Sequence, residues 1–314
     1  MIRRVMKGMR RLENFVKWLQ EEGRSEGTIK TYLQVEEFLN WWTQEKAADT
    51  FDPEEVTVMD LQEYKQFLIH HARNKRGGRL AAATVNKRLQ MIRTYFKSLA
   101  DTGDITYNPA LKIKPQKIQN RRATVRWLEE KEKIRILRKI NNPEGSKNKW
   151  HYIRNRAMVY TLLMGGLRVS ELADLIIPDI DLAKRRLIVH DGKGGKERDV
   201  PINDDLFQAL SEWLEIRKQS PGEIVFPSQK KGKFTLQGIE HIIGKIGEQL
   251  GLEDFTPHVL RHTFCHDLHI KGYQLQVIAD LAGHEDLNTT RIYTTPGVKE
   301  TKKAVNSLSM GDSF

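Results

Sequence analysis

The sequence predicts a mostly α-helical protein of two domains, the second of which carries a small antiparallel sheet. Three features of the 314-residue chain predict this fold class. Apolar residues repeat at helical spacing through the first third, a cationic segment containing prolines follows, and one hairpin pattern interrupts the helical patterns of the remainder. We therefore expect domains at residues 1–110 and 127–314, joined by a basic linker at residues 111–126.

Four amphipathic helices account for the first domain, over about residues 9–108. In each of them apolar residues recur every three or four positions, and Gly23 and Gly103 end the first and the last helix. The second helix begins at Ser25, a residue type favoured at helix N-caps. The expected segments are residues 12–23, 25–42, 56–74 and 81–103.

The segment NPALKIKPQKIQNRRATVRW follows, and Pro109 and Pro115 prevent it from forming a continuous helix. Its cations occur with no acidic residue between them: Lys112, Lys114, Lys117, Arg121, Arg122 and Arg126. A solvated linker is one interpretation. However, the chain has 52 Lys and Arg against 41 Asp and Glu, and such an excess attracts polyanions, most often nucleic acid. We therefore expect the basic linker to lie along a phosphate backbone, with the first five of these cations binding DNA.

The composition argues against several other classes of protein. No apolar run approaches the roughly 20 residues that a membrane-spanning helix needs. The N-terminal MIRRVMKGMRRL is basic, but the apolar core of a secretory signal does not follow it. The single cysteine, Cys265, allows no intramolecular disulfide and is typical of the reducing cytoplasm, where we expect the protein to act.

Beyond Trp127 the pattern changes to helices around a hairpin. Two β-rich segments, RRLIVH and RDVPI, flank the Gly-rich turn DGKGGKE, and this arrangement predicts an antiparallel pair of strands. Helical patterns cover residues 128–140, 152–165 and 203–218, and helices continue toward the end of the chain.

Arg168 is the first candidate for phosphate chemistry. In MGGLRVSEL, Gly165 and Gly166 end one helix, and Glu171 lies early in the next. The guanidinium is thus expected beside a helix N-terminus, which favours anions, and Glu171 could orient it. A purely structural ion pair between Arg168 and Glu171 is the alternative.

Lys193 lies in the turn of the predicted hairpin. A lysine flanked by glycines at the tip of a hairpin can reach into a groove of a ligand. An ordinary exposed lysine is the alternative, and Lys196 is a close competitor for any role.

His258 and Arg261 are three residues apart in TPHVLRHTF, so on a helix both side chains point to one spot near its N-terminus. An alternative is a zinc site, whose ligands would be His258, His262, Cys265 and His266. The H-E-x-x-H pattern lacks its glutamate here, and the sequence has no C-x-x-C. We therefore favour an anion site without a metal, with His262 as a buried, hydrogen-bonded histidine.

The last candidates are His284 and Tyr293, in LAGHEDLNTTRIYT. Gly283 breaks a helix at His284, and a short helical piece then carries Tyr293, although a lone tyrosine is more often part of a core. Together the candidates supply cations, proton-transfer groups and an oxygen nucleophile. Neither an acidic cluster for magnesium nor a G-x-x-x-x-G-K-[ST] loop for ATP accompanies them, so we expect no cofactor.

These motifs, taken in order, resemble those of the tyrosine recombinase (phage-integrase) family. The matching segments are GGLRVSEL, GKGGKERDVPI, TPHVLRHTF and LAGHEDLNTTRIYT, and the resemblance spans essentially the whole chain. It implies a two-domain DNA clamp, with an N-terminal four-helix SAM-like core-binding domain and an α-rich catalytic domain. The first helix begins too early to leave room for an additional arm-binding domain, which favours a recombinase of the Xer kind or a transposon-encoded resolvase.

The resemblance also implies a role for each site residue. The catalytic residues would be Arg168, Lys193, His258, Arg261, His284 and the nucleophile Tyr293, with Glu171 in support. The tyrosine would attack a DNA phosphodiester, forming a 3′-phosphotyrosine bond and freeing a 5′-hydroxyl. The arginines would bind the non-bridging oxygens, the first histidine would handle the phenol proton, the second would hydrogen-bond the phosphate, and the lysine would protonate the leaving oxygen.

The family resemblance further implies how the protein assembles. Four protomers would hold two specific sites on duplex DNA and exchange strands through a Holliday junction, and accessory proteins are further candidate partners. The C-terminal GVKETKKAVNSLSM offers Val298, Val305 and Leu308 for docking on a neighbouring protomer, with a frayed terminus as the alternative. Two other functions stay open: a DNA-binding architectural or regulatory protein that does not cut, and a type IB topoisomerase that relaxes supercoils as a monomer.

Overall fold

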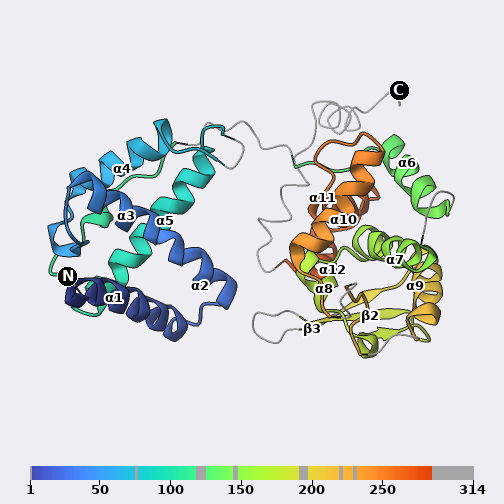
Figure 1. Cartoon of the computed structure of the whole chain (residues 1–314). Helices are drawn as coiled ribbons and strands as arrows, with labels where there is room; N and C mark the ends of the chain where they lie inside the picture. Colours follow the sequence, from blue (N-terminus) through green and yellow to red (C-terminus); the bar gives the residue numbers. More distant parts are fainter. Residues whose placement is uncertain are drawn as a thin grey trace, which may run out of the picture. The chain divides into compact units, whose positions relative to one another are not determined.

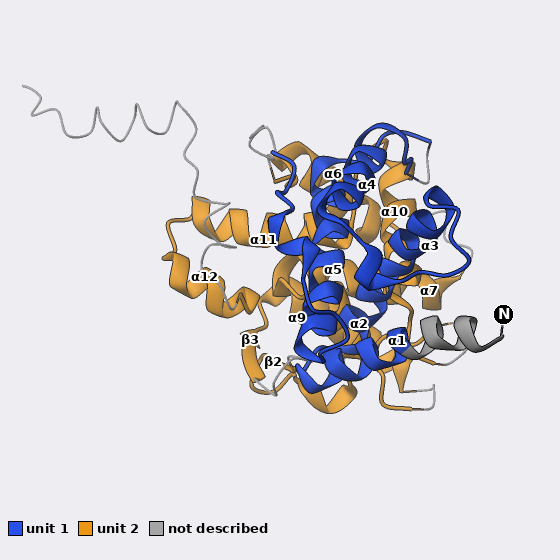
Figure 2. Ribbon diagram, turned by 90° about the vertical axis from the view of Figure 1, so that its left-hand side faces the viewer, with its two compact units in different colours: residues 1–122 blue, residues 123–314 orange. Residues whose placement is uncertain are grey.

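The chain folds into two compact units, residues 1–122 and residues 123–314 (Figure 1 and Figure 2). Each unit contains its own hydrophobic core, which is the mark of a domain. The structure is a computed structural model that describes, with side chains from residue 11 onward, residues 2–74, 77–117, 125–143, 148–190, 197–218, 222–228 and 232–284.

The first unit is built from helices around an aromatic core. Its α-helices are α1 (Ile2–Glu21), α2 (Glu26–Tyr32), α3 (Glu36–Glu45), α4 (Val58–His70) and α5 (Ala82–Asp101), and its 3-10 helices are η1 (Leu33–Val35), η2 (Pro53–Glu55) and η3 (Pro109–Lys112). Phe38 packs edge-to-face against Tyr64 and Phe96, with ring centroids 5.0 and 6.2 Å apart. Such aromatic pairs stabilise a core beyond the area that they bury.

The prediction of one uninterrupted helix over residues 25–42 is wrong. The 3-10 helix η1 separates α2 from α3. Val35 in η1 is only 2% exposed, and η1 packs against α5. Packing against another helix therefore overrides the continuous helical periodicity of this segment.

The segment from residue 109 to residue 117 packs on the first unit. Ala110 and Ile113 are buried in its core. The Gln116 N–H donates to Asn86 Oδ1 at 2.7 Å, and the Asn86 amide donates to Gln116 O at 3.0 Å. The backbone of this half of the basic linker is thus held against the helices, whereas its three lysine side chains are exposed: Lys112, Lys114 and Lys117.

The second unit places helices around one central helix (Figure 1). Its helices are α6 (Glu130–Asn141), α7 (Lys149–Gly165), α8 (Val169–Asp174), η4 (Ile177–Asp179), α9 (Asp204–Arg217), α10 (Leu236–Gln249), α11 (Pro257–Ile270) and α12 (Leu275–Ala282). Buried residues occur on every side of α7, which packs against both α9 and α11. A helix without a polar face is typical of the centre of a domain.

A three-stranded antiparallel sheet covers part of this core. Its strands are β1 (Ile180–Asp181), β2 (Arg186–His190) and β3 (Glu197–Pro201), paired in the order β1-β2-β3. Leu187 lies opposite Val200, and both are buried. The predicted hairpin is confirmed in its two strands, its turn lies outside the described residues, and the short β1 was not predicted.

The prediction of a mostly α-helical protein with a small antiparallel sheet is therefore confirmed. None of the described helices combines the length and the apolar character that crossing a lipid bilayer demands.

Candidate active site

A glycine shapes the junction that carries Arg168. Gly166 follows α7 in the left-handed region, at φ 65°. A Cβ at this position would lie 2.3 Å from the ring of Phe264 on α11, so a larger residue would displace that ring. The chain then enters α8 directly, with Arg168 at the N-cap position.

Glu171 holds both the backbone and the side chain of Arg168. Its Oε2 accepts the Arg168 backbone N–H at 2.7 Å, and its Oε1 accepts Nη1 of the guanidinium at 2.7 Å. The Glu171 side chain is 5% exposed, whereas that of Arg168 is 31% exposed. One buried carboxylate thus caps α8 and fixes a guanidinium that still reaches the surface.

Arg261 reaches the same place from α11. Its side chain is 5% exposed, and it donates to Gly166 O at 2.6 Å and to Ala282 O at 2.5 Å. Burial, and then the charge of Arg168, lower the pKa of Arg261 to about 10. The guanidinium therefore remains charged at neutral pH.

Arg198 on β3 belongs to the site, although none of the predictions named it. Its Nη1 and Nη2 donate to the two carboxylate oxygens of Glu171 at 2.9 and 2.8 Å. A signal was available in the sequence, because Arg198 and Val200 are two residues apart in a strand and therefore share its inner face. A charged residue on an inner face indicates a buried partner of opposite charge.

The C-terminal end of α12 is where the three arginines meet. Its last carbonyls each accept a hydrogen bond from a different arginine: Leu281 from Arg198, Ala282 from Arg261, and Gly283 from Arg168. Gly283 is left-handed, at φ 66°, and a Cβ there would lie 2.6 Å from Nη1 of Arg198. Carbonyls at a helix C-terminus carry partial negative charge, so the end of α12 organises the three guanidinium groups.

His284 directly follows this helix end and is half-buried. Burial, followed by the charges of Arg261 and Arg168, lowers the pKa of His284 to about 4. The imidazole is therefore neutral at physiological pH, and it can hydrogen-bond a phosphate without adding charge.

The two histidines near the start of α11 differ in exposure. His258 is exposed and His262 is half-buried, with their ring centroids 6.2 Å apart. Burial, and then the neighbouring His258 and Arg261, lower the pKa of His262 to about 4. His262 is thus close to both the exposed His258 and the buried Arg261.

Positive charge exceeds negative charge in this cluster. Burial alone would raise the pKa of Glu171, but hydrogen bonds and charge from Arg198 and Arg168 outweigh burial and lower that pKa to about 2. Arg261 Nη1 also lies 4.0 Å from Glu171 Oε2. Three guanidinium groups against one ionised carboxylate leave a surplus of two positive charges, which suits a phosphodiester.

The structure brings together four of the predicted site residues, namely Arg168, Glu171, Arg261 and His284, with His258 at the edge of the cluster. The other predicted residues and the competing lysine lie outside the described residues: Arg121, Arg122, Lys193, Lys196, Tyr293 and the tail residues Val298, Val305 and Leu308.

Arg126, the last cation of the basic linker, is engaged within the second unit. Its Nη1 and Nη2 donate to the carboxylate of Glu132 at 2.9 and 2.6 Å. This bidentate pair matches its charge, so Arg126 differs from the exposed lysines at the start of the linker.

The side chains of the proposed zinc ligands have other neighbours. Cys265 is fully buried in a cluster with Ile278 and Ala282. His266 stacks on Trp127, with ring centroids 4.3 Å apart. Across the part of the chain that the structure describes, no group of three or more His, Cys, Asp and Glu residues could hold a metal ion.

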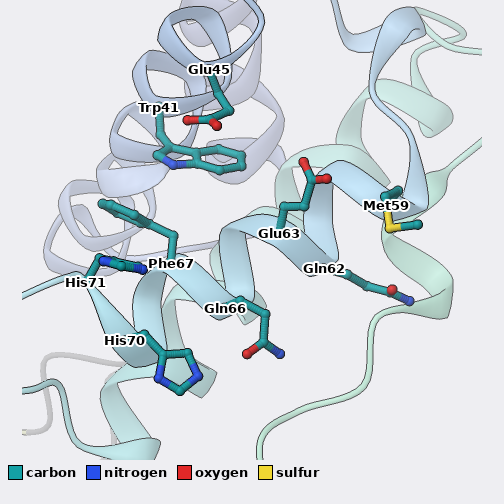
Figure 3. A pocket seen from close by; sticks show the side chains of 9 residues that line it. All are labelled: Trp41, Glu45, Met59, Gln62, Glu63, Gln66, Phe67, His70 and His71. Carbon is teal, nitrogen blue, oxygen red and sulfur yellow. The ribbon is translucent and has the colours of Figure 1, made fainter.

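A separate pocket of about 580 Å³ lies on the first unit, on α3 and α4 (Figure 3). Trp41 and Phe67 line it with ring centroids 5.9 Å apart. Glu45 and Glu63 also line it, and two carboxylates repel a polyanion. This pocket is therefore chemically unlike the arginine cluster and does not suit a phosphate backbone.

Two protein families match the chain. The phage integrase family matches residues 126–300, which is more than half of the chain. The phage integrase N-terminal SAM-like domain matches residues 12–103.

Curated relatives match over almost their whole length. The tyrosine recombinase XerC of Herpetosiphon aurantiacus is 30% identical over 293 residues, which cover 90% of this chain and 89% of that protein. XerD of Rickettsia conorii is 30% identical over 305 residues, covering 91% and 94%. XerA of Thermococcus kodakarensis is 30% identical over 298 residues, covering 93% of each.

Solved structures share the fold at lower identity. The Tn1549 transposon integrase in complex with a circular intermediate DNA has a TM-score of 0.71 at 20% identity, covering 95% of this chain and 99% of that one. The XerH site-specific recombinase bound to its difH substrate has a TM-score of 0.71 at 22% identity, covering 89% and 78%. These likenesses support the helical two-domain fold.

Proposed function

Because the chain belongs to the phage integrase family of tyrosine recombinases, enzymes that cleave and rejoin DNA, we propose that it is a Xer-like site-specific recombinase of duplex DNA. One observation supports this most directly. Arg168, Arg261 and His284 converge at the end of α12 beside the buried Glu171, and they leave a surplus of positive charge. This is the charge pattern that stabilises a phosphodiester during its cleavage.

The arginines take the place of a metal ion in this proposal. A phosphodiester repels nucleophiles, and more charge develops on its equatorial oxygens during transfer. Arg168 and Arg261 bind the non-bridging oxygens, and backbone carbonyls and Glu171 hold both guanidinium groups in position before DNA arrives. Preorganised donors of this kind need little reorganisation during the reaction. The neutral His284 adds one hydrogen bond to the same phosphate.

Tyr293 is the proposed nucleophile. Its phenol oxygen forms a bond to phosphorus while the bond from phosphorus to the 5′-oxygen breaks, leaving a 3′-phosphotyrosine. His258 accepts the phenol proton, and Lys193 gives a proton to the leaving 5′-oxygen, a kind of help worth about 10²–10⁴-fold. Because a phenol is a better leaving group than an alkoxide, the 5′-hydroxyl of another strand can displace it without ATP.

DNA contacts outside the cluster are proposed for the basic linker. The side chains of Lys112, Lys114 and Lys117 are exposed on the first unit, and Arg121 and Arg122 follow them in the sequence. Each cation that neutralises a phosphate releases a counterion, so binding through them is sensitive to salt and independent of base sequence.

The proposed assembly is a homotetramer that holds two DNA sites and exchanges strands pairwise through a Holliday junction. The C-terminal tail docks on a neighbouring protomer, and accessory proteins are candidate additional partners. The task is dimer resolution or the movement of a mobile element, and such DNA substrates place the enzyme in the cytoplasm.

The experiment uses nicked DNA that carries a site selected by this protein from a random library. After cleavage the short fragment diffuses away and leaves the covalent adduct trapped. We expect an adduct with the native protein, and unchanged binding without an adduct for Tyr293→Phe. An adduct in that variant would move the nucleophile elsewhere, for example to Tyr273, which is 53% exposed.

Two other outcomes separate the remaining functions. Binding without any adduct from the native protein would favour an architectural or regulatory role. Relaxation of a supercoiled plasmid by a monomer, without pairing of two sites, would favour a type IB topoisomerase.

A further inference from the structure

The Arg198 guanidinium is directed into the interior of the second unit. Both terminal nitrogens donate to Glu171, and Nε donates to Leu281 O at 2.9 Å. The Arg198 side chain is 13% exposed, against 31% for that of Arg168. The guanidinium therefore links three elements, β3, α8 and α12, and its three nitrogens are directed at protein acceptors.

We propose that Arg198 is a positioning residue of the recombinase, which neutralises Glu171 so that Arg168 and Arg261 stay available to the scissile phosphate. This inference rests on the proposed function. Arg198 acts through the carboxylate and through the end of α12, and it does not bind the phosphate itself.

Charge balance is the first argument. Arg168 Nη1 lies 2.7 Å from Glu171 Oε1, and Arg261 Nη1 lies 4.0 Å from Oε2. Without Arg198, the arginines described beside the Glu171 carboxylate would be Arg168 and Arg261. They would be drawn toward it, and the surplus of positive charge in the cluster would fall from two to one.

Backbone geometry is the second argument. Gly283 adopts φ 66°, and a Cβ there would lie 2.6 Å from Nη1 and 2.9 Å from Cζ of Arg198. The guanidinium thus lies against the backbone of the residue whose carbonyl receives Arg168. Loss of Arg198 would release this helix end, and with it the carbonyl acceptors of Arg168 and Arg261.

The test measures DNA affinity and single-turnover cleavage separately, on nicked DNA with protein in excess. We expect Arg198→Met to slow cleavage by about 10²-fold, because small displacements of catalytic groups have effects of this size. DNA affinity should stay within about twofold of the native value, since Arg198 does not contact phosphate. The matched control is Arg186→Met on the neighbouring strand, where Arg186 pairs with Asp199 at 3.1 Å, and it should cleave at the native rate.

A double variant separates positioning from general stability. With Glu171→Gln added to Arg198→Met, no uncompensated carboxylate remains to draw Arg168 and Arg261 away. Cleavage should then be faster than in Arg198→Met alone, whereas a merely structural arginine predicts a double variant that is equally slow or slower. Protonation of Glu171 has the same effect as Glu171→Gln, and loss of Arg198 removes a contact that lowers the pKa of Glu171. The cleavage deficit of Arg198→Met relative to the native protein should therefore shrink as the pH falls, and the double variant should show no such recovery.

The possible outcomes are distinct. If the native protein forms no adduct, the proposed function fails. If it forms one and Arg198→Met matches its rate, or loses only DNA affinity, the positioning role is overturned while the proposed function stands. If Arg198→Met does not fold, Arg198→Gln decides: it keeps a hydrogen-bonding side chain but carries no charge to neutralise Glu171, so a native cleavage rate in Arg198→Gln overturns the proposal.

Discussion

Two buried carboxylates occupy the same position in two helices and have different surroundings. Asp60 in α4 and Glu171 in α8 are each the third residue of the helix, and each accepts the backbone N–H of the N-cap residue, at 2.9 and 2.7 Å. Asp60 also accepts Trp42 Nε1 at 3.2 Å and pairs with Lys46 at 2.6 Å. Glu171 faces three arginines instead.

The difference lies in the balance of charge rather than in burial. Asp60 is closely matched by one lysine, which indicates a structural role in the first unit. Glu171 lies in a cluster that retains two positive charges after the carboxylate is counted. A buried capping carboxylate is thus no sign of function by itself, whereas an excess of guanidinium groups around it is one.

Arg261→Ala should give the largest effect, because it removes one donor to the phosphate. We expect cleavage of nicked DNA to slow by about 10²–10³-fold, the usual effect of losing one preorganised donor to a developing oxyanion. The matched control in the first unit is Lys46→Ala, which removes the cation that pairs with Asp60 and should leave the cleavage rate unchanged. A loss of less than tenfold in Arg261→Ala, in protein shown to be folded by thermal unfolding, would contradict the comparison.

Replacing Lys112, Lys114 and Lys117 with Ala should affect DNA affinity rather than chemistry. Each lost phosphate contact lowers the slope of log affinity against log salt by about 0.9, so the slope should fall by about 2 to 3. Filter binding at several salt concentrations measures it, and cleavage at saturating protein should stay native. An unchanged slope would mean that the basic linker is a solvated connection and does not bind phosphates.

Asp60→Ala should lower the free energy of unfolding without changing the cleavage rate. The buried Trp42 Nε1–H would lose its acceptor, and an unsatisfied buried donor costs about 1–3 kcal/mol of unfolding free energy. Urea unfolding measures the loss, and the cleavage rate per folded molecule should equal that of the native protein. A catalytic defect as large as that of Arg261→Ala would remove the distinction between the two carboxylates.

The pH dependence of stability should reveal the cluster in the second unit. The pKa of His284 and that of His262 are lowered from 6.5 to about 4, so the unfolded chain binds protons first as the pH falls. Stability should therefore decrease between about pH 6.5 and pH 4. For Glu171, lowered from 4.5 to about 2, stabilisation is complete above about pH 4.5 and lost toward pH 2.

The substitution His284→Gln tests the expected loss of stability between pH 6.5 and pH 4. It should flatten the decrease in urea midpoint between pH 6.5 and pH 4 and leave the region below pH 4 almost unchanged. An identical pH profile would mean that His284 does not resist protonation in the folded state.

EDTA should have the smallest effect, namely none. The proposed reaction uses guanidinium groups where other enzymes use a metal ion, so cleavage should persist at the native rate after chelation. Loss of cleavage that added zinc restores would revive the metal site at His258, His262, Cys265 and His266.

Helix content was predictable from the sequence because apolar spacing is a local property. The patterns of α5, α7 and α9 reveal their approximate extent, the pattern of α5 also reveals its buried face, and the hairpin strands follow from β-rich segments around a Gly-rich turn. The 3-10 break at η1 and the short β1 were not predictable in this way, since both depend on packing against distant elements.

In the candidate active site, too, features that depend on contacts between distant residues were not predictable from the sequence. Arg168 and Arg261 could be proposed because glycines and a proline mark the helix ends beside them. Arg198 was missed because its partner Glu171 is 27 residues away, and only its inner-face position in β3 hinted at a buried contact. The carbonyls at the end of α12 bear no side-chain signature, so no motif could reveal that they hold all three arginines.

Those carbonyls have a thermodynamic consequence for DNA binding. A free arginine side chain loses up to about 2 kcal/mol of rotamer entropy when it is fixed. Hydrogen bonds to Gly166, Ala282 and Gly283 already restrict Arg168 and Arg261 in the folded chain. Most of this entropy is therefore lost on folding, and binding of a phosphate to the cluster costs little additional side-chain entropy.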